Sequence, residues 1–146
     1  MVNRRRTLAG MGTALFGSLA GCSFLGQETL IDFSESETIT EGGYLAYTHT
    51  IQDPFTFEYT VEVTEGPSID VMLMERSSFD EYRDGNFDSV THISRMSDIR
   101  TSSTQASGDM DAGTYTLLLD NTNDVGTNPP RSGDEVVVDV SYAAHL

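Results

Sequence analysis

The residues that could supply nucleophilic or acid–base chemistry are few in this chain of 146 residues. It has three histidines, His49, His92 and His145, and no serine in the G-x-S-x-G setting that exposes a nucleophile on a strained turn. His49 shares one face of a period-two segment with apolar residues, which favours a packed imidazole, and His145 is expected to fray with the chain end. A Ser–His–Asp site assembles in space and stays open at this point. Since no residue marks such a site, we predict that the protein is not an enzyme, with a surface hydrolase as the weaker alternative.

Oxygen-rich turns are the next candidates for chemistry. Asp109 and Asp111 lie in one turn and Asp120 and Asp124 in another, and carboxylate and amide oxygens are the ligands that Ca²⁺ prefers. Neither turn matches the D-x-[DN]-x-[DN]-G loop, and hydrated surface turns are the alternative interpretation. The single cysteine and the lack of an H-E-x-x-H motif predict no zinc site. We therefore expect no cofactor other than calcium.

Tyrosines could instead form a binding surface. Tyr44, Tyr47 and Tyr82 are candidates for lining a carbohydrate or peptide site, although a strand tyrosine is more often half-packed with its hydroxyl at the rim. Pairs of carboxylates suited to glycoside hydrolysis would arise by chance among 23 acidic residues, so no pair is assigned.

The charge of the chain indicates the salt concentration in which the protein works. The formal net charge is −15, every basic residue is arginine, and there is no lysine. Without residues 1–21 the chain has 23 acidic residues against five arginines, a formal charge of −18. Such self-repulsion is screened at molar salt, where the Debye length is about 3 Å. The composition resembles that of haloarchaeal proteins, and the lack of basic clusters argues against nucleic acid as a partner.

The first 21 residues have the three parts of an export signal. Arg4, Arg5 and Arg6 precede an uncharged, glycine-rich segment that is too short to span a bilayer comfortably. The arginines followed by Thr7-Leu8 resemble the twin-arginine signal, which exports folded proteins. The sequence leaves open which two arginines form the recognised pair.

A lipid-attachment motif follows directly. Leu19-Ala20-Gly21-Cys22 resembles the lipobox of exported lipoproteins, in which the cysteine is lipidated and the chain is cut before it. Cys22 is the only cysteine, so it cannot form a disulfide within the chain. We expect Cys22 to anchor the protein to the outer face of the cytoplasmic membrane, with residues 22–28 as a tether.

The elements that must position these groups are strands, because period-two alternation dominates residues 29–146. Phe55–Thr64 is the clearest case, with apolar residues on one face and polar residues on the other. The other predicted strands are Gly43–Ile51, Ile69–Met74, Thr114–Leu119 and Val136–Tyr142, with weaker signals at Leu30–Phe33, Val90–Met96 and Ser102–Met110. About eight strands at this spacing predict an all-β fold, an antiparallel, jelly-roll-like β-sandwich. One short helical turn is expected at Phe79–Arg83, capped by Ser77 or Ser78 and ended by Gly85.

A family resemblance supports this fold. The segment Asp111–Thr122, an acidic turn leading into a strand that ends in Asp-Asn-Thr, resembles the penultimate strand of pre-peptidase C-terminal and GOLD-type β-sandwiches. The resemblance implies binding or assembly rather than catalysis and brings no active site with it. We expect a lipid-anchored binding or interaction module with a protein partner at the cell surface, or alternatively a carbohydrate or small-ligand binder.

Overall fold

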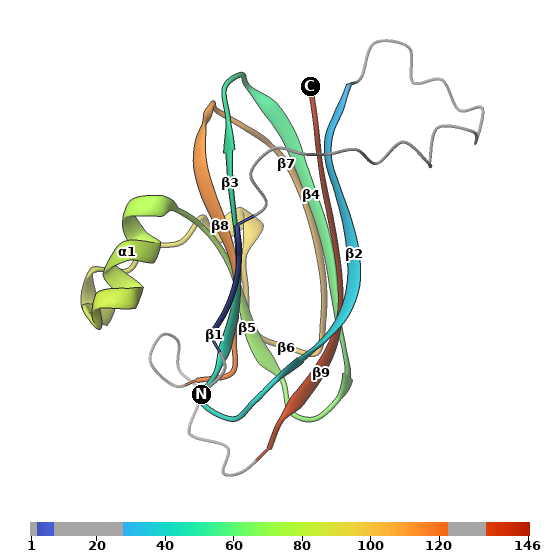
Figure 1. The fold of residues 1–146 in the computed structure, drawn as a ribbon, viewed down its shortest axis with the longest axis vertical. Helices are drawn as coiled ribbons and strands as arrows, with labels where there is room; N and C mark the ends of the chain where they lie inside the picture. Colours follow the sequence, from blue (N-terminus) through green and yellow to red (C-terminus); the bar gives the residue numbers. More distant parts are fainter. Residues whose placement is uncertain (1–2, 8–27, 123–133) are drawn as a thin grey trace, which may run out of the picture.

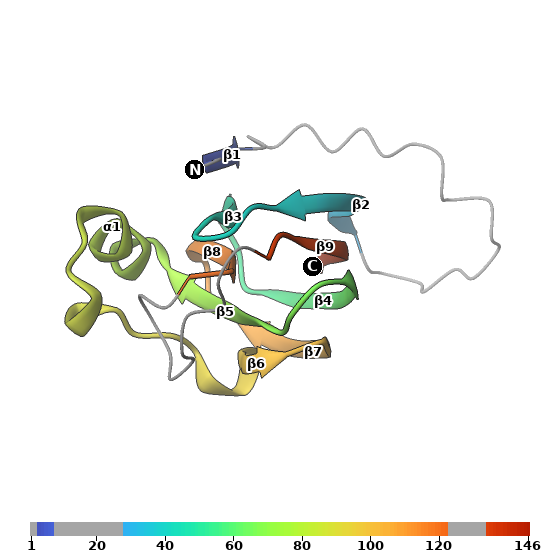
Figure 2. The same ribbon diagram turned by 90° about the horizontal axis from the view of Figure 1, so that it is seen from below.

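The computed structural model describes residues 3–7, 28–122 and 134–146, and it is a sandwich of two β-sheets (Figures 1 and 2). One sheet has four antiparallel strands in the order β2 (Thr29–Ile39), β9 (Val136–His145), β4 (Phe55–Glu65) and β7 (Ser103–Met110). The other has the order β1 (Asn3–Thr7), β3 (Tyr44–Ile51), β8 (Gly113–Asp120), β5 (Ile69–Glu75) and β6 (Asp98–Thr101). In this second sheet β1 pairs with β3 in parallel and the other pairs are antiparallel. The predicted antiparallel β-sandwich is confirmed.

The core lies between the sheets and follows the predicted alternation. In β4 the residues Phe55, Phe57, Tyr59 and Val61 are buried, and the residues between them face away from the core. Central strand β9 contributes its even-numbered residues from Val136 to Ala144 in the same way. Because successive side chains of a strand point to opposite faces, these two strands each have one face in the core and one face outside it.

The helix α1 (Arg76–Asp84) covers the outer face of the second sheet (Figure 1). It buries Phe79 and Tyr82 in a second apolar cluster together with Tyr44, Ala46, Met72, Met74 and Leu118. This cover explains why six consecutive residues of β5, Ile69 to Met74, are buried. The predicted stop at Gly85 is confirmed by its left-handed φ of 81°, but the predicted serine cap is not formed. Glu75 is at the cap position, and the Ser78 hydroxyl lies 2.9 Å from that of Thr91.

Two other expectations are corrected by the structure. Val90–Met96 is not a strand: irregular chain there contains a 3₁₀ turn at Ser94–Met96, and the short strand β6 follows it. Its apolar residues Val90, Ile93 and Met96 recur every third position, a spacing that fits turns better than strands. Strand β2 extends to Ile39, well past the predicted Phe33, because pairing with β9 continues through its polar half.

The expected export and anchor segment is described only in part. Residues 3–7, which contain Arg4, Arg5 and Arg6, form β1, whereas residues 8–27, with Cys22, lie outside the described ranges. Among the residues that the structure describes, no helix is long and apolar enough to cross a membrane.

Candidate ligand-binding site

The outer face of the four-stranded sheet contains a hollow of about 520 Å³. This volume is within the range of small-molecule sites, roughly 300–1,000 Å³. The hollow is lined by three consecutive residues from each of β4, β7 and β9 and by two from β2. The lining residues on the outer face of the sheet are Asp32, Glu58, Thr60, Gln105, Ser107, Ser141 and Ala143.

Strand register explains how these distant residues meet. One row across the sheet pairs Asp32 of β2 with Ala143 of β9, Ala143 with Glu58 of β4, and Glu58 with Ser107 of β7. The next row pairs Ser141 with Thr60 and Thr60 with Gln105. Ser141 and Ala143 of β9 and Thr60 of β4 are small, whereas their neighbours Asp32, Glu58 and Gln105 are longer. We attribute the hollow to this difference in side-chain size.

The charge at the hollow is negative. Asp32 and Glu58 line it, and Glu62 and Asp139 face each other in a neighbouring row of the same face. The described arginines lie elsewhere, in β1 and β6 of the other sheet, on α1 and in the turn at Ser94–Met96. The nearby cationic candidate is His145, whose Nε2 is 3.3 Å from Oε1 of Glu58 and whose Nδ1 is 3.3 Å from the Thr29 hydroxyl. His145 is thus not frayed, because β9 keeps its pairing with Thr29 and Thr56 at this position.

His49 is buried inside the sandwich, as its alternation predicted. It is 8% exposed, and its Nε2 lies 2.9 Å from the Tyr142 hydroxyl. The space beside it has a volume of about 10 Å³, at the lower limit for holding one water molecule. A substrate could not reach this imidazole without opening the core.

The three candidate binding tyrosines are also inside the protein, which corrects their expected surface role. Tyr47 is 3% exposed and packs in the main core at 5.3 Å from the Tyr142 ring. Tyr44 and Tyr82 are 8% and 5% exposed, and their rings meet edge to face at 5.1 Å beneath α1. Tyr47 faces the opposite sheet, whereas Tyr44 lies on the face of β3 that α1 covers and Tyr82 lies on α1 itself.

The candidate calcium residues do not converge. Asp109 accepts a hydrogen bond from Thr56 at 2.8 Å, and the carbonyl of Asp111 accepts one from Tyr115 at 3.0 Å. Asp120 is at the other end of β8, while Asp124 is outside the described residues. Within the described ranges, no group of three or more His, Cys, Asp or Glu side chains is placed to hold a metal ion.

Two aspartates form a buried pair at the end of β5 and β8. Asp70 and Asp120 are cross-strand neighbours and are each 1% exposed. Asp70 accepts a 2.7 Å hydrogen bond from the Arg100 backbone N–H, and Asp120 accepts one of 2.8 Å from that of Thr122. Burial raises the pKa of Asp70, against the lowering effects of that hydrogen bond and of the Arg100 and His92 charges. Burial likewise raises the pKa of Tyr59 to about 12, and its hydroxyl donates to the Met96 carbonyl at 2.9 Å.

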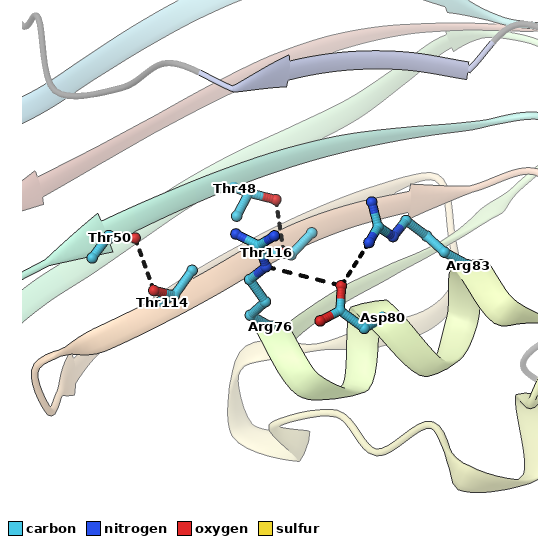
Figure 3. Close-up of polar contacts among 7 residues, drawn as sticks. All are labelled: Thr48, Thr50, Arg76, Asp80, Arg83, Thr114 and Thr116. Atoms are coloured by element: carbon cyan, nitrogen blue, oxygen red, sulfur yellow. Dashed lines mark hydrogen bonds and ion pairs between the residues drawn. The ribbon is translucent and has the colours of Figure 1, made fainter.

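A polar surface beside α1 has its groups already paired (Figure 3). Thr48 bonds to Thr116, and Thr50 to Thr114, each at 2.8 Å across β3 and β8. On the helix, Asp80 pairs with Arg83 at 2.8 Å and with Arg76 at 3.9 Å. These hydroxyl pairs stabilise the sheet, and such exposed ion pairs contribute little, roughly 0–1 kcal/mol. The hollow on the other sheet is therefore the better candidate site.

Comparisons with known proteins support the fold. No protein-family model matches the chain, and no curated protein matches it by sequence. Among solved structures, it is similar to the pre-peptidase C-terminal domain of collagenase from Bacillus anthracis. That similarity has a TM-score of 0.52 and 10% identity over 77% of this chain and 89% of the other. A periplasmic inhibitor of g-type lysozyme from Aeromonas hydrophila, PliG, aligns with a TM-score of 0.43 and 12% identity over 77% of this chain and 85% of the other. The sandwich architecture implied by the Asp111–Thr122 resemblance is confirmed at the level of the fold.

Proposed function

We propose that this protein is a non-catalytic binding module, anchored by lipid at Cys22 to the outer face of the cytoplasmic membrane of a halophilic archaeon. The observation that carries the binding role is the polar hollow on the four-stranded sheet. It is open to solvent and of ligand size, and four strands with fixed register hold its side chains in place.

A binding role fits the described residues better than catalysis. His49 is enclosed in the core, and His145 contacts a carboxylate and a threonine rather than an activated nucleophile. The likeness to the pre-peptidase C-terminal domain of collagenase supports the sandwich fold alone, because a shared fold does not carry a shared site.

The cellular address rests on the N-terminal sequence. Arg4, Arg5 and Arg6 would direct export, and Cys22 would receive the lipid. Two acyl or alkyl chains are enough for stable membrane attachment. The 23 acidic residues and the lack of lysine fit a surface exposed to molar salt.

The hollow favours the small-ligand version of this role. A protein partner usually covers a broad, flat area with an apolar centre. The hollow instead offers hydroxyl, amide and carboxylate groups around a depression. We therefore propose, as an alternative to a protein partner, that the hollow binds a small molecule or a short extended segment of a polymer.

The lipid anchor is tested by replacing Cys22, whose sulfur would carry the lipid, in the protein expressed in a halophilic host. We expect the wild type to require detergent for extraction, and Cys22→Ser to appear in the soluble fraction, because it cannot be lipidated. Ser23→Ala, one residue further on, is the matched control and should stay with the membrane. Detergent-dependent extraction of Cys22→Ser would refute the anchor.

The binding role is tested by filling the hollow. Ala143→Trp places a large side chain over the hollow, whereas Val137→Trp lies on the same face of β9 but outside it. Cells are treated with a chemical crosslinker at full salt. We expect wild type and Val137→Trp to give the same crosslinked product with the bound molecule, and Ala143→Trp to lose this product. A crosslinked product that survives Ala143→Trp would show that the hollow is not the binding site.

A further inference from the structure

The chemistry of the hollow also specifies its ligand; this inference rests on the proposed binding role. Asp32 and Glu58 are separated by one strand, with Ala143 between them. Two strand spacings place their Cα atoms about 10 Å apart. Two carboxylates thus lie on either side of Ala143, and all three residues line the depression.

The other groups of the hollow extend this acceptor character. The Thr60 and Ser141 hydroxyls and the Gln105 amide oxygen accept hydrogen bonds, and they lie in the row next to Glu58. An ammonium or guanidinium group offers three to five N–H donors and no acceptor, so it needs such a set of oxygens. Charge-assisted bonds of this kind are roughly twice as strong as neutral ones.

Glu58 remains available to a ligand despite its contact with His145. That contact uses Oε1 at 3.3 Å, and the Glu58 side chain is 54% exposed. A second donor can therefore approach its carboxylate from the solvent side. No arginine of the described chain lies on this face to compete for it.

Other ligand classes fit less well. The aromatic rings nearest the hollow, Phe33, Tyr59 and Tyr142, point into the core and are at most 8% exposed, so a neutral sugar finds no ring to stack on. An anionic ligand would be repelled by Asp32 and Glu58.

We infer that the hollow binds a cationic group, an ammonium or guanidinium at the end of a flexible chain, held between Asp32 and Glu58. A free polyamine and an arginine side chain of an extended peptide share this chemistry. The site therefore selects its ligand by charge and by donor number rather than by ring stacking.

The test uses the full chain with Cys22→Ser, labelled for NMR, in 2 M KCl, where unspecific attraction to an acidic surface is screened beyond about 3 Å. Spermidine and the tripeptide Gly-Arg-Gly are titrated as the two cationic probes. Cellotriose and glutarate are the neutral and anionic controls. We expect amide shifts around Glu58, Gln105 and Ser141 with at least one cationic probe and none with the controls.

Charge-neutral variants locate the binding. Glu58→Gln should weaken binding of the cationic probe about tenfold, the loss expected for one charge-assisted hydrogen bond. Glu62→Gln is the matched control, because it lies on the same face of β4 but outside the hollow, and it should change affinity less than about twofold. Equal losses in both variants would reveal unspecific charge attraction and overturn the inference.

Two further outcomes separate this inference from the proposed function. Binding of cellotriose but of neither cation at the hollow would refute the cationic ligand and leave the binding module intact. Absence of shifts with every probe would overturn the cationic assignment, while the crosslinking comparison of Ala143→Trp with Val137→Trp would still decide whether the hollow binds anything.

Discussion

At the residue scale, the buried carboxylate of Asp70 costs stability when it is ionised, because burial disfavours the charged form. Asp70 also holds Arg100, which has a left-handed φ of 58° at the irregular pairing of β5 with β6, through its bond to the Arg100 N–H. An asparagine would retain an oxygen for that bond and remove the charge.

We therefore predict that Asp70→Asn raises the melting temperature by a few degrees at pH 7. Because the folded-state pKa of Asp70 is raised above 3.8, folding favours its protonated form. Stability from this group is present at low pH and is lost as pH rises through the usual value to the raised one. The gain of Asp70→Asn should therefore disappear as pH falls toward 4, as thermal melts across pH would show.

The exposed Asp53→Asn is the control for this experiment and should melt like the wild type at both pH values. An Asp70→Asn variant that is less stable at pH 7, or that keeps the same advantage at pH 4, would contradict the assignment of the cost to the Asp70 charge.

At the element scale, two glycines with positive φ differ in what an added Cβ atom would meet. Gly66, between β4 and β5, has a φ of 95°, and a Cβ there would lie 2.4 Å from the Glu135 carbonyl oxygen. Gly85, at the end of α1, has a φ of 81° and open space around it. The turn after β4 thus packs directly against the chain that leads into β9.

We predict that Gly85→Ala costs about 1–2 kcal/mol, the strain of a left-handed alanine alone. Gly66→Ala adds a backbone clash that cannot relax through a side chain and should cost at least about 3 kcal/mol. Denaturant unfolding of both variants in the Cys22→Ser background measures the difference. Equal costs would show that the β4–β5 turn can move away from Glu135.

The sequence predicted those strand and helix limits that depend only on residues close together in the chain. The alternation of Phe55–Thr64 predicted the limits of β4 closely, and Gly85 predicted the end of α1, whereas α1 begins at Arg76, before the predicted Phe79. The hollow depends instead on strand order and register, which place Asp32 beside Ala143 and Ala143 beside Glu58 although they are far apart in the chain. A run of small residues on the polar face of β9, Ser141 and Ala143, was the one local sign of it.

At the scale of the whole molecule, we expect the charge balance to make stability depend on salt. Residues 22–146 carry a formal charge of −18, and the pairs of Asp80 with Arg76 and Arg83 are partly exposed on α1. We therefore expect salt screening to offset the repulsion.

We predict that lowering KCl from 3 M to 0.1 M reduces the melting temperature by roughly 10 °C or more, because the Debye length grows from below 3 Å to about 10 Å. Calorimetry of the Cys22→Ser chain measures this. Sucrose added at low salt is the control: it strengthens burial without screening and should restore less stability than KCl. A melting temperature indifferent to KCl would contradict a fold adapted to brine.

If the chain is cut before Cys22 as proposed, the loss of strand β1 would change the fold. This strand covers the outer edge of β3 as a parallel neighbour along five residues, from Asn3 opposite Tyr44 to Thr7 opposite Thr48 (Figure 2). Cleavage before Cys22 would remove this cover and leave two sheets of four strands, with the backbone N–H and C=O groups along one side of β3 exposed. Such an edge is a template for pairing with another strand. The export signal would then have a second effect. By pairing with β3 it would keep the folded precursor from associating through this edge until the signal is removed at the membrane.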